Sequence, residues 1–182
     1  GAVRRAILLA EEHPNWAFLY QYANEANPRA HYETTGPEIW ADCPEITHFV
    51  AGLGTSGTLM GVGTFLKEQN PDVRIIAVEP PLGEKVEGLR NLEEGYIPPV
   101  YEKWGGEQLL YRKRVVRPKE SIEGTRMLAE HCGIFAGISA GAALAGARKV
   151  AGEIESGTIV FVVCDGGWKY LSTGAWTDDI DE

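Results

Sequence analysis

The chain has 182 residues, of which 44% are apolar, and its 17 basic and 26 acidic side chains give a formal net charge of −9. A chain of this size and composition buries an apolar core without help from disulfides or metals, so one globular unit is expected. The negative charge disfavours nucleic acids and anionic membrane surfaces as partners. Cys43, Cys132 and Cys164 are widely scattered, which is typical of reduced thiols in a cytoplasmic protein.

The first forty residues predict a helix, a strand and a loop. Apolar Val3, Ala6 and Ile7 already stand at helical spacing, with no initiator Met or cap before them, so we expect the chain to lack its beginning. The segment "AFLYQY" (17–22) has the composition of a short strand. The stretch "NEANPRAHYETTGPEI", rich in Asn and Pro, predicts a loop that leads into a helix starting near Gly36.

The middle of the sequence alternates between strand and helix patterns. A strand is expected at "THFVAG" (47–52), a helix at "GTLMGVGTFLKEQ" (57–69) and a second strand at "RIIAVEP" (74–80). This order predicts a parallel pair of strands joined by a right-handed crossover. Residues 81–120 are richer in Gly, Pro and charge, and we expect an irregular excursion of short helices and loops there.

Regular structure is expected again in the last third. Helices are predicted for "SIEGTRMLAEHCG", with Gly133 as its carboxyl-terminal cap, and for "GISAGAALAGARKVAGEI". The continuous apolar run "TIVFVVCDGG" (158–167) suits a strand at the centre of a parallel sheet. The whole pattern predicts an α/β fold, with a twisted, mostly parallel sheet covered by helices on both faces.

The turn within "AGLGTSGTLMG" (51–61) is the clearest candidate for a ligand site. A glycine-rich turn from a strand into a helix presents free backbone N–H groups and the positive end of the helix dipole, which together favour phosphate. No Lys follows the second glycine and the spacing is not GxGxxG, so neither a Walker loop nor a dinucleotide fingerprint is present. A plain strand-to-helix turn, with glycines for packing and hydroxyls for capping, remains an alternative.

Metal and cysteine chemistry have little support in the sequence. The four histidines are far apart and none has HExxH spacing, so no metal is expected: His13, His31, His48 and His131. Cys164 follows the last apolar run beside Asp165, without a nearby His or Lys to lower its pKa, and is not expected to act as a nucleophile.

Five segments, in order along almost the whole chain, carry a resemblance to a known family. They are "NPRAHYETTGPEI", "FVAGLGTSGTLMGVGTFLKE", "IIAVEP", "GISAGAALAGA" and "DGGWKYLSTGAW". Together they resemble the cysteine synthase and cystathionine β-synthase family, enzymes of fold type II that use pyridoxal 5'-phosphate. The resemblance implies that residues 1–182 are the carboxyl-terminal portion of such an enzyme, forming most of its large domain, and that residues 81–120 lie on the substrate side.

The resemblance also implies roles for particular residues. In this family the GTSGT segment holds the phosphate of the cofactor, a role that falls here on Gly54, Thr55, Ser56, Gly57 and Thr58. The serine of "GISAG", here Ser139, faces the pyridine nitrogen. A neutral hydroxyl partner makes the cofactor a milder electron sink and favours β-elimination over transamination. Ser139 as the N-cap of the following helix is a structural alternative, and both roles are compatible.

One further match concerns the substrate. The stretch "GLRNLEEG" resembles the part of the O-phosphoserine-dependent, actinobacterial type of cysteine synthase that supplies an arginine for the substrate phosphate. This residue is Arg90, whose planar fork suits paired phosphate oxygens. The ending "DGGWKYLSTGAW" is also more similar to that subgroup than to the acetylserine enzymes. An exposed surface arginine without a special role is the alternative reading.

The sequence departs from the family in one important respect. The segments that carry the Schiff-base lysine and the asparagine loop of the family have no counterpart here, and Lys169 matches a position that does not form the Schiff base. We therefore expect no catalytic residue in this chain, and we expect the chain alone to be inactive.

For the intact enzyme the resemblance implies cysteine biosynthesis. A sulfur donor, either sulfide or a sulfur-carrier protein, replaces the β-substituent of O-phospho-L-serine or O-acetyl-L-serine to give L-cysteine. The classes are transferase or lyase, and a cytoplasmic homodimer without nucleic-acid or membrane partners is expected. Cystathionine β-synthase activity and a non-catalytic phosphate-ligand module that has lost the lysine both remain open.

Overall fold

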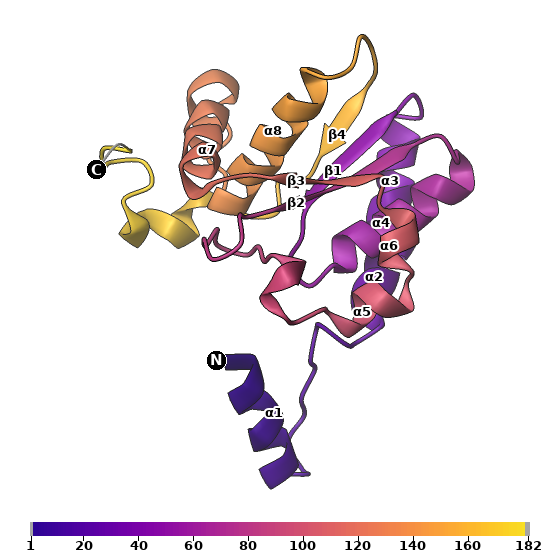
Figure 1. Ribbon diagram of the computed structural model, residues 1–182, viewed down its shortest axis with the longest axis vertical. Coiled ribbons are helices and arrows are strands. Elements are labelled where there is room, and N and C mark those ends of the chain that lie inside the picture. The colour runs from indigo at the N-terminus through magenta and orange to yellow at the C-terminus, as the bar shows by residue number, and fades with distance from the viewer. Residues whose placement is uncertain (1, 181–182) are drawn as a thin grey trace.

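Helices and strands alternate along residues 2–180, which are the residues that the computed structural model describes (Figure 1). The helices are α1 (Ala2–Glu12), α2 (Ala26–Ala30), α3 (Gly36–Asp42), α4 (Gly57–Gln69), α5 (Pro99–Lys103), α6 (Gly106–Leu109), α7 (Pro118–Cys132) and α8 (Ile138–Ala151). The strands are β1 (His48–Gly52), β2 (Arg74–Glu79), β3 (Arg112–Val115) and β4 (Ile159–Phe161). A π-helical turn η1 (His31–Thr35) joins α2 to α3, and 3₁₀ turns η2 (Leu92–Glu94) and η3 (Gly167–Thr173) complete the elements.

The four strands form one parallel sheet in the order β3-β2-β1-β4. In this register His48 of β1 lies opposite Arg74 of β2 and Ile159 of β4, and Ile76 of β2 lies opposite Arg112 of β3. The predicted α/β class, the parallel pair and its helical crossover α4 are therefore confirmed.

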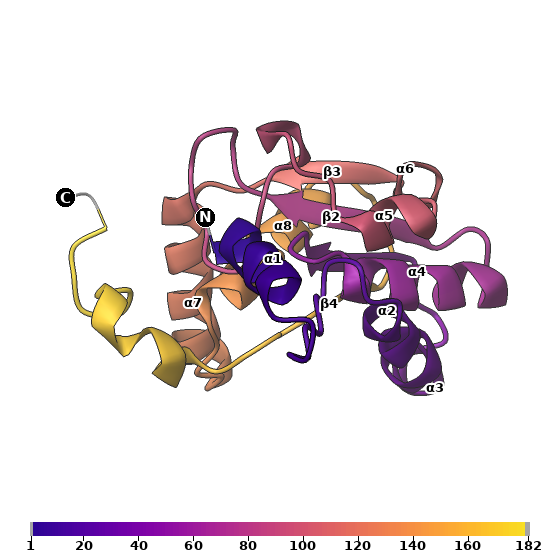
Figure 2. The ribbon, with the colours of Figure 1, turned by 90° about the horizontal axis from the view of Figure 1, so that it is seen from below.

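Successive side chains of the central strands enter two different cores. Phe49 and Ile75 pack with the α4 side of the sheet, whereas Val50 and Ile76 pack with α8. All four are buried, and each contributes about 1.5–3 kcal/mol by leaving water. Figure 2 shows α7 and α8 on one side of the molecule and α2, α3 and α4 on the other, so helices cover both faces of the sheet as predicted.

Helices α7 and α8 are in close backbone contact, and this contact fixes the position of α8. A Cβ added to Gly141 would lie 2.0 Å from the carbonyl oxygen of Ser121, and one added to Gly124 would lie 2.2 Å from the carbonyl oxygen of Gly141. Only glycine permits this backbone contact between the helices. The amino end of α8 is thereby held at the edge of the sheet where the parallel strands end.

Two predictions for the first forty residues were wrong. Residues 17–22 do not form a strand; Leu19 is 76% exposed and Tyr20 has a φ of 32°. No described strand pairs with the segment, and its backbone bonds elsewhere, as when Val100 N of α5 donates to Tyr22 O at 3.0 Å. Residues 26–35, expected as a loop, are helical in α2 and η1, and Asn24 Oδ1 accepts a bond from Ala26 N at 3.0 Å just before α2.

Two strands also differ from expectation. Strand β3 falls inside the predicted irregular excursion, where its three consecutive basic residues do not resemble a buried strand. Strand β4 is only three residues long, half-buried, and pairs with β1 alone among the described residues, so the predicted central position for the 158–167 run was wrong. The short helices α5 and α6 of the excursion are confirmed.

The predicted helices near both ends of the chain are present. Gly133 caps α7 with a φ of 67°, as expected, and α8 follows. Helix α1 buries none of its side chains and stands apart from the sheet in Figure 1. Within residues 2–180, no helix combines the length and the apolar character that crossing a bilayer requires.

Candidate functional site

The turn between β1 and α4 has the form expected of an anion site. Ser56 adopts a left-handed backbone with a φ of 75°, and its Oγ is buried without a hydrogen-bond partner among the described residues. Within the same part of the chain, no backbone or side-chain acceptor is recorded for the N–H groups of Gly54, Thr55 and Ser56. Unpaired donors at the start of a 13-residue helix favour a bound anion.

An asparagine from α2 supports this turn from the side. Nδ2 of Asn27 donates to Oγ1 of Thr55 at 3.0 Å and to the carbonyl oxygen of Gln21 at 2.8 Å. A Cβ added to Gly57 would lie 2.0 Å from Oδ1 of Asn27. Because Gly57 has no side chain, the amide of Asn27 can approach the turn and hydrogen-bond to it.

His31 supports the end of the turn at Thr58 through side-chain hydrogen bonds. Oγ1 of Thr58 lies 3.2 Å from Nε2 of His31, whose Nδ1 lies 3.0 Å from Oγ1 of Thr35. Burial lowers the pKa of His31 below its ordinary value of 6.5, so the ring is neutral at neutral pH. A neutral ring supports Thr58 through hydrogen bonding rather than charge.

A second loop, after β2, lies against the first. The backbone N of Arg90 donates to the carbonyl oxygen of Leu53 at 2.8 Å. A Cβ added to Gly54 would lie 2.5 Å from the carbonyl oxygen of Gly88. The structure therefore brings the predicted phosphate turn and the predicted substrate arginine to the same edge of the sheet.

The guanidinium of Arg90 lies against two tyrosine rings that contact each other edge to face. Its central carbon is 4.9 Å from the ring centroid of Tyr22 and 4.9 Å from that of Tyr96. Nη2 of Arg90 also lies 3.4 Å from the hydroxyl of Tyr22, and the hydroxyls of Tyr96 and Tyr20 are 2.5 Å apart. Each cation–π contact contributes about 0.5–1 kcal/mol at a partly exposed site. Arg90 is therefore a positioned side chain rather than a freely solvated one.

Ser139 lies in the first turn of α8, at the same edge. Its side chain is almost completely buried, and a Cβ added to Gly88 would lie 3.7 Å from Cβ of Ser139. Gly137, not Ser139, is the N-cap residue, and its backbone N donates to Asp165 O at 2.9 Å. The alternative reading of Ser139 as the helix N-cap was therefore wrong, and its hydroxyl lies within hydrogen-bond reach of the Cys164 thiol instead.

Several features that the sequence did not single out complete the arrangement. Asn27 and His31 lie inside the "NPRAHYETTGPEI" motif, and this membership was the signal for their importance. Tyr22 and Tyr96 carried no comparable signal, because they are separated by more than seventy positions and meet only in the fold. Lys169 forms an exposed ion pair with Asp165 at 3.8 Å. No group of three or more potential metal ligands occurs within residues 2–180.

The residues of the turn fit the phosphate group of a cofactor. The orphaned Ser56 Oγ and the unpaired N–H groups supply donors, and the amide of Asn27 beside Gly57 braces the turn. Several charge-assisted hydrogen bonds to one dianion are the strongest kind that such a turn forms. Fold and site together define an α/β protein with a glycine-rich turn of unpaired donors at the carboxyl edge of a parallel sheet.

Comparison with known proteins agrees with this class. A sequence profile described as "Pyridoxal-phosphate dependent enzyme" matches residues 1–165. Cysteine synthase B of Pseudomonas aeruginosa is 40% identical over 159 residues, which are 87% of this chain and 52% of that protein. The chain therefore belongs to the family of pyridoxal-phosphate dependent enzymes, whose cofactor is pyridoxal phosphate.

Solved structures are similar in fold. O-acetylserine sulfhydrylase isoform 3 of Entamoeba histolytica has a TM-score of 0.85 at 30% identity, over 98% of this chain and 55% of that one. An O-acetylserine-dependent cystathionine β-synthase of Helicobacter pylori has a TM-score of 0.85 at 33% identity, over 97% of this chain and 59% of that one. The chain thus spans little more than half the length of these relatives.

Proposed function

We propose that this chain is the part of a cysteine synthase that grips the phosphate of pyridoxal 5'-phosphate and recognises the leaving group of the amino-acid substrate. The observation that carries the proposal is the turn of residues 54–58, with its unpaired donors braced by Asn27. The similarity to cysteine synthase B supports the assignment to cysteine biosynthesis.

Each residue of the site has a separate task in this proposal. Gly54, Thr55, Ser56, Gly57 and Thr58 would hold the cofactor phosphate through backbone N–H groups and hydroxyls. Oγ of Ser139 would meet the pyridine nitrogen as a neutral hydrogen-bond partner. When bound, the cofactor supplies an electron sink for negative charge at the substrate α-carbon.

Arg90 would bind the phosphate of O-phospho-L-serine. The reaction exchanges the bond between Cβ and the phosphate oxygen for a bond between Cβ and sulfur, and releases inorganic phosphate. A guanidinium fork binds two oxygens of that leaving group and neutralises charge as it departs. The two tyrosine rings that the guanidinium contacts support the proposal, because they hold the fork in one place.

Two alternatives are weighed against this substrate. Two similar structures bear names that refer to O-acetylserine, and one of them is a cystathionine β-synthase. A neutral acetyl group needs no arginine, so the stacked Arg90 favours phosphoserine. A non-catalytic phosphate-ligand module would use the same turn without any turnover. We further propose a cytoplasmic homodimer that takes sulfur from sulfide or from a sulfur-carrier protein.

Steady-state kinetics of the full-length protein tests the proposal. Arg90→Ala is expected to raise KM for O-phosphoserine at least tenfold while changing KM for O-acetylserine less than twofold. Arg90→Lys keeps the charge but loses the fork, so it should recover only part of the affinity. Faster turnover of O-acetylserine, with no effect of Arg90→Ala, would refute the phosphoserine assignment. Phosphate-ligand binding without turnover of either donor would establish the non-catalytic module instead.

A further inference from the structure

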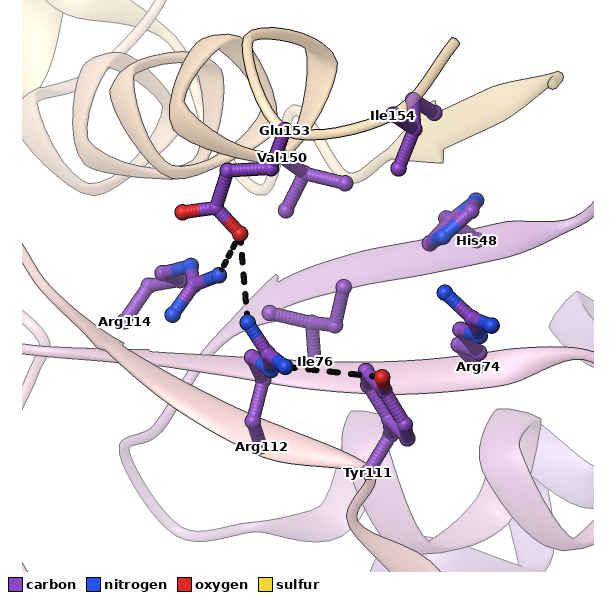
Figure 3. Close-up of a pocket in the computed structure, with 9 residues that line it drawn as sticks. All are labelled: His48, Arg74, Ile76, Tyr111, Arg112, Arg114, Val150, Glu153 and Ile154. Atoms are coloured by element: carbon purple, nitrogen blue, oxygen red, sulfur yellow. Dashed lines mark hydrogen bonds and ion pairs between the residues drawn. The ribbon is translucent and has the colours of Figure 1, made fainter. Parts of the chain in front are cut away.

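A second polar cavity lies at the opposite edge of the sheet, where the strands begin. It has a volume of about 130 Å³ and lies between the first residues of β1, β2 and β3 and the end of α8 (Figure 3). Its polar wall consists of His48, Arg74, Tyr111, Arg112, Arg114 and Glu153. Residues of the candidate cofactor site do not line it.

The cavity wall carries more positive than negative charge. Nη1 of Arg112 lies 3.1 Å from Oε2 of Glu153, and Arg114 pairs with the same oxygen. Arg74 has no ion pair among the described residues and stacks on Tyr111 at 4.7 Å instead. Three guanidinium groups thus share one carboxylate, in a chain whose formal net charge is −9.

Nearby basic residues are paired differently. Lys113, on the other face of β3, has the buried Glu79 at 3.4 Å. Lys149 of α8 has Glu120 at 2.7 Å. These lysines each have a carboxylate of their own, whereas the three arginines of the cavity share one.

One arginine donor in the cavity wall is buried without an acceptor. Nε of Arg114 has no hydrogen-bond partner among the described residues, and the side chain is only 18% exposed. Leaving a buried charged donor unpaired is costly. No water-sized atom reaches Nε itself, so this donor adds positive charge beside the cavity that no acceptor balances.

The remaining titratable groups around the cavity do not cancel its charge. Burial, and then the charge of Arg74, lower the pKa of His48, so this ring is neutral at neutral pH. Asp72 and Glu155 line an adjoining, more open hollow together with Arg74, and neither forms an ion pair with it within 4.0 Å. Glu153 fastens the end of α8 to β3, a structural role that leaves most of the arginine donors unused.

We propose that this cavity binds a small tetrahedral dianion, either inorganic phosphate or sulfate or the phosphate group of a small phosphomonoester. The volume suits one such group, and two surplus positive charges match a charge of −2. Guanidinium forks bind the paired oxygens of phosphate and sulfate. Tyr111 keeps two of the forks in place, because Arg74 and Arg112 stack on it at 4.7 and 4.9 Å.

Calorimetric titration of the full chain with phosphate, sulfate and glycerol 3-phosphate, at constant ionic strength in chloride, tests the proposal. Saturable binding is expected, and Arg112→Gln and Arg74→Gln should each weaken it at least tenfold. Arg117→Gln is the matched control: this arginine is exposed and ion-paired to Glu84, and its loss should change the affinity less than twofold. Glu153→Gln should tighten binding several-fold, because it removes the competing carboxylate. Circular dichroism verifies that each variant is folded.

Phosphate is also expected at residues 54–58, so the two sites must be told apart. The NMR signal of the Arg114 Nε–H group should shift on titration, and should shift equally in Gly57→Ala, which alters only the turn. If glycerol 3-phosphate and inorganic phosphate bind with equal affinity, the site accepts the phosphate group of a phosphomonoester. If glycerol 3-phosphate binds much more weakly, the ligand is the free inorganic ion. Absence of saturable binding, unchanged affinity in Arg112→Gln, or shifts confined to residues 54–58 would overturn this site and leave the proposed function untouched.

Discussion

The two edges of the sheet offer hydrogen-bond donors of different origin. At the carboxyl edge the donors are backbone N–H groups and hydroxyls of the turn at residues 54–58. At the amino edge they are the side chains of Arg74, Arg112 and Arg114, on the strands themselves. Backbone donors depend on the shape of the chain, whereas side-chain donors depend on residue identity. Substitutions that add side-chain atoms to the turn should therefore disrupt the carboxyl edge. Substitutions that remove an arginine charge should disrupt the amino edge.

The largest effect is expected from Gly57→Ala at the carboxyl edge. The new Cβ would lie 2.0 Å from Oδ1 of Asn27, so Asn27 must move and release its bonds to Thr55 and Gln21. We expect affinity for pyridoxal 5'-phosphate, followed by absorbance in the full-length protein, to fall at least tenfold. The free energy of unfolding should fall by about 1–3 kcal/mol.

A glycine near the other edge supplies the control for that change. A Cβ added to Gly152, just after α8, would meet no atom nearer than 3.7 Å, which is an ordinary contact. Gly152→Ala should therefore leave both cofactor affinity and stability nearly unchanged. Equal losses in the two variants would show that the turn has no special shape requirement.

An intermediate effect is expected from pH, because each edge contains a buried histidine. The pKa values of His31 and His48 are both lowered from 6.5 in the folded chain, so the unfolded chain binds more protons below that pH. Stability should be constant above about pH 7 and should fall as the pH drops through 6.5 toward the folded pKa values. The loss is about 1.4 kcal/mol for each unit by which a pKa is lowered.

Urea unfolding between pH 5 and 8 measures this dependence. His31→Gln and His48→Gln should each flatten the curve. Added phosphate should change the contribution of His48 more than that of His31. A dianion beside Arg74 raises the pKa of His48, so His48 then contributes less to the loss of stability at low pH. A pH dependence that neither substitution alters would assign the loss to other groups.

The sequence predicted the carboxyl edge better than the amino edge, for a physical reason. The apolar runs around β1 and β2 and the glycines between them are local signals, so the parallel pair, α4 and the phosphate turn followed from neighbouring residues. Strand β3 has no such signal, because a run of consecutive basic residues also describes an exposed loop. Its arginines meet His48 only through the register of the sheet.

The same distinction explains the errors at residues 17–22 and 158–167. Both runs have the composition of strands, but composition does not reveal whether a neighbouring strand exists, which decides 17–22. It also does not reveal the position in the sheet, which decides 158–167, where β4 pairs with β1 alone among the described residues. Tyr22 and Tyr96 illustrate the converse, because their contact with Arg90 depends on two loops that meet only after folding. The resemblance to a family indicated Arg90 but not what holds it.

The smallest expected effect is that of Arg112→Gln on stability in the absence of an added dianion. Arg112 and Glu153 are 42% and 49% exposed, and Glu153 keeps Arg114 as a partner after the substitution. An ion pair this exposed contributes about 0–1 kcal/mol, so chemical denaturation in chloride should detect a change of about 0.5 kcal/mol or less. In phosphate, however, the wild-type chain should gain stability with ligand concentration while the variant does not, because only a folded cavity binds the dianion. A large loss of stability in chloride alone would mean that the arginines hold α8 in place and are not arranged for a ligand.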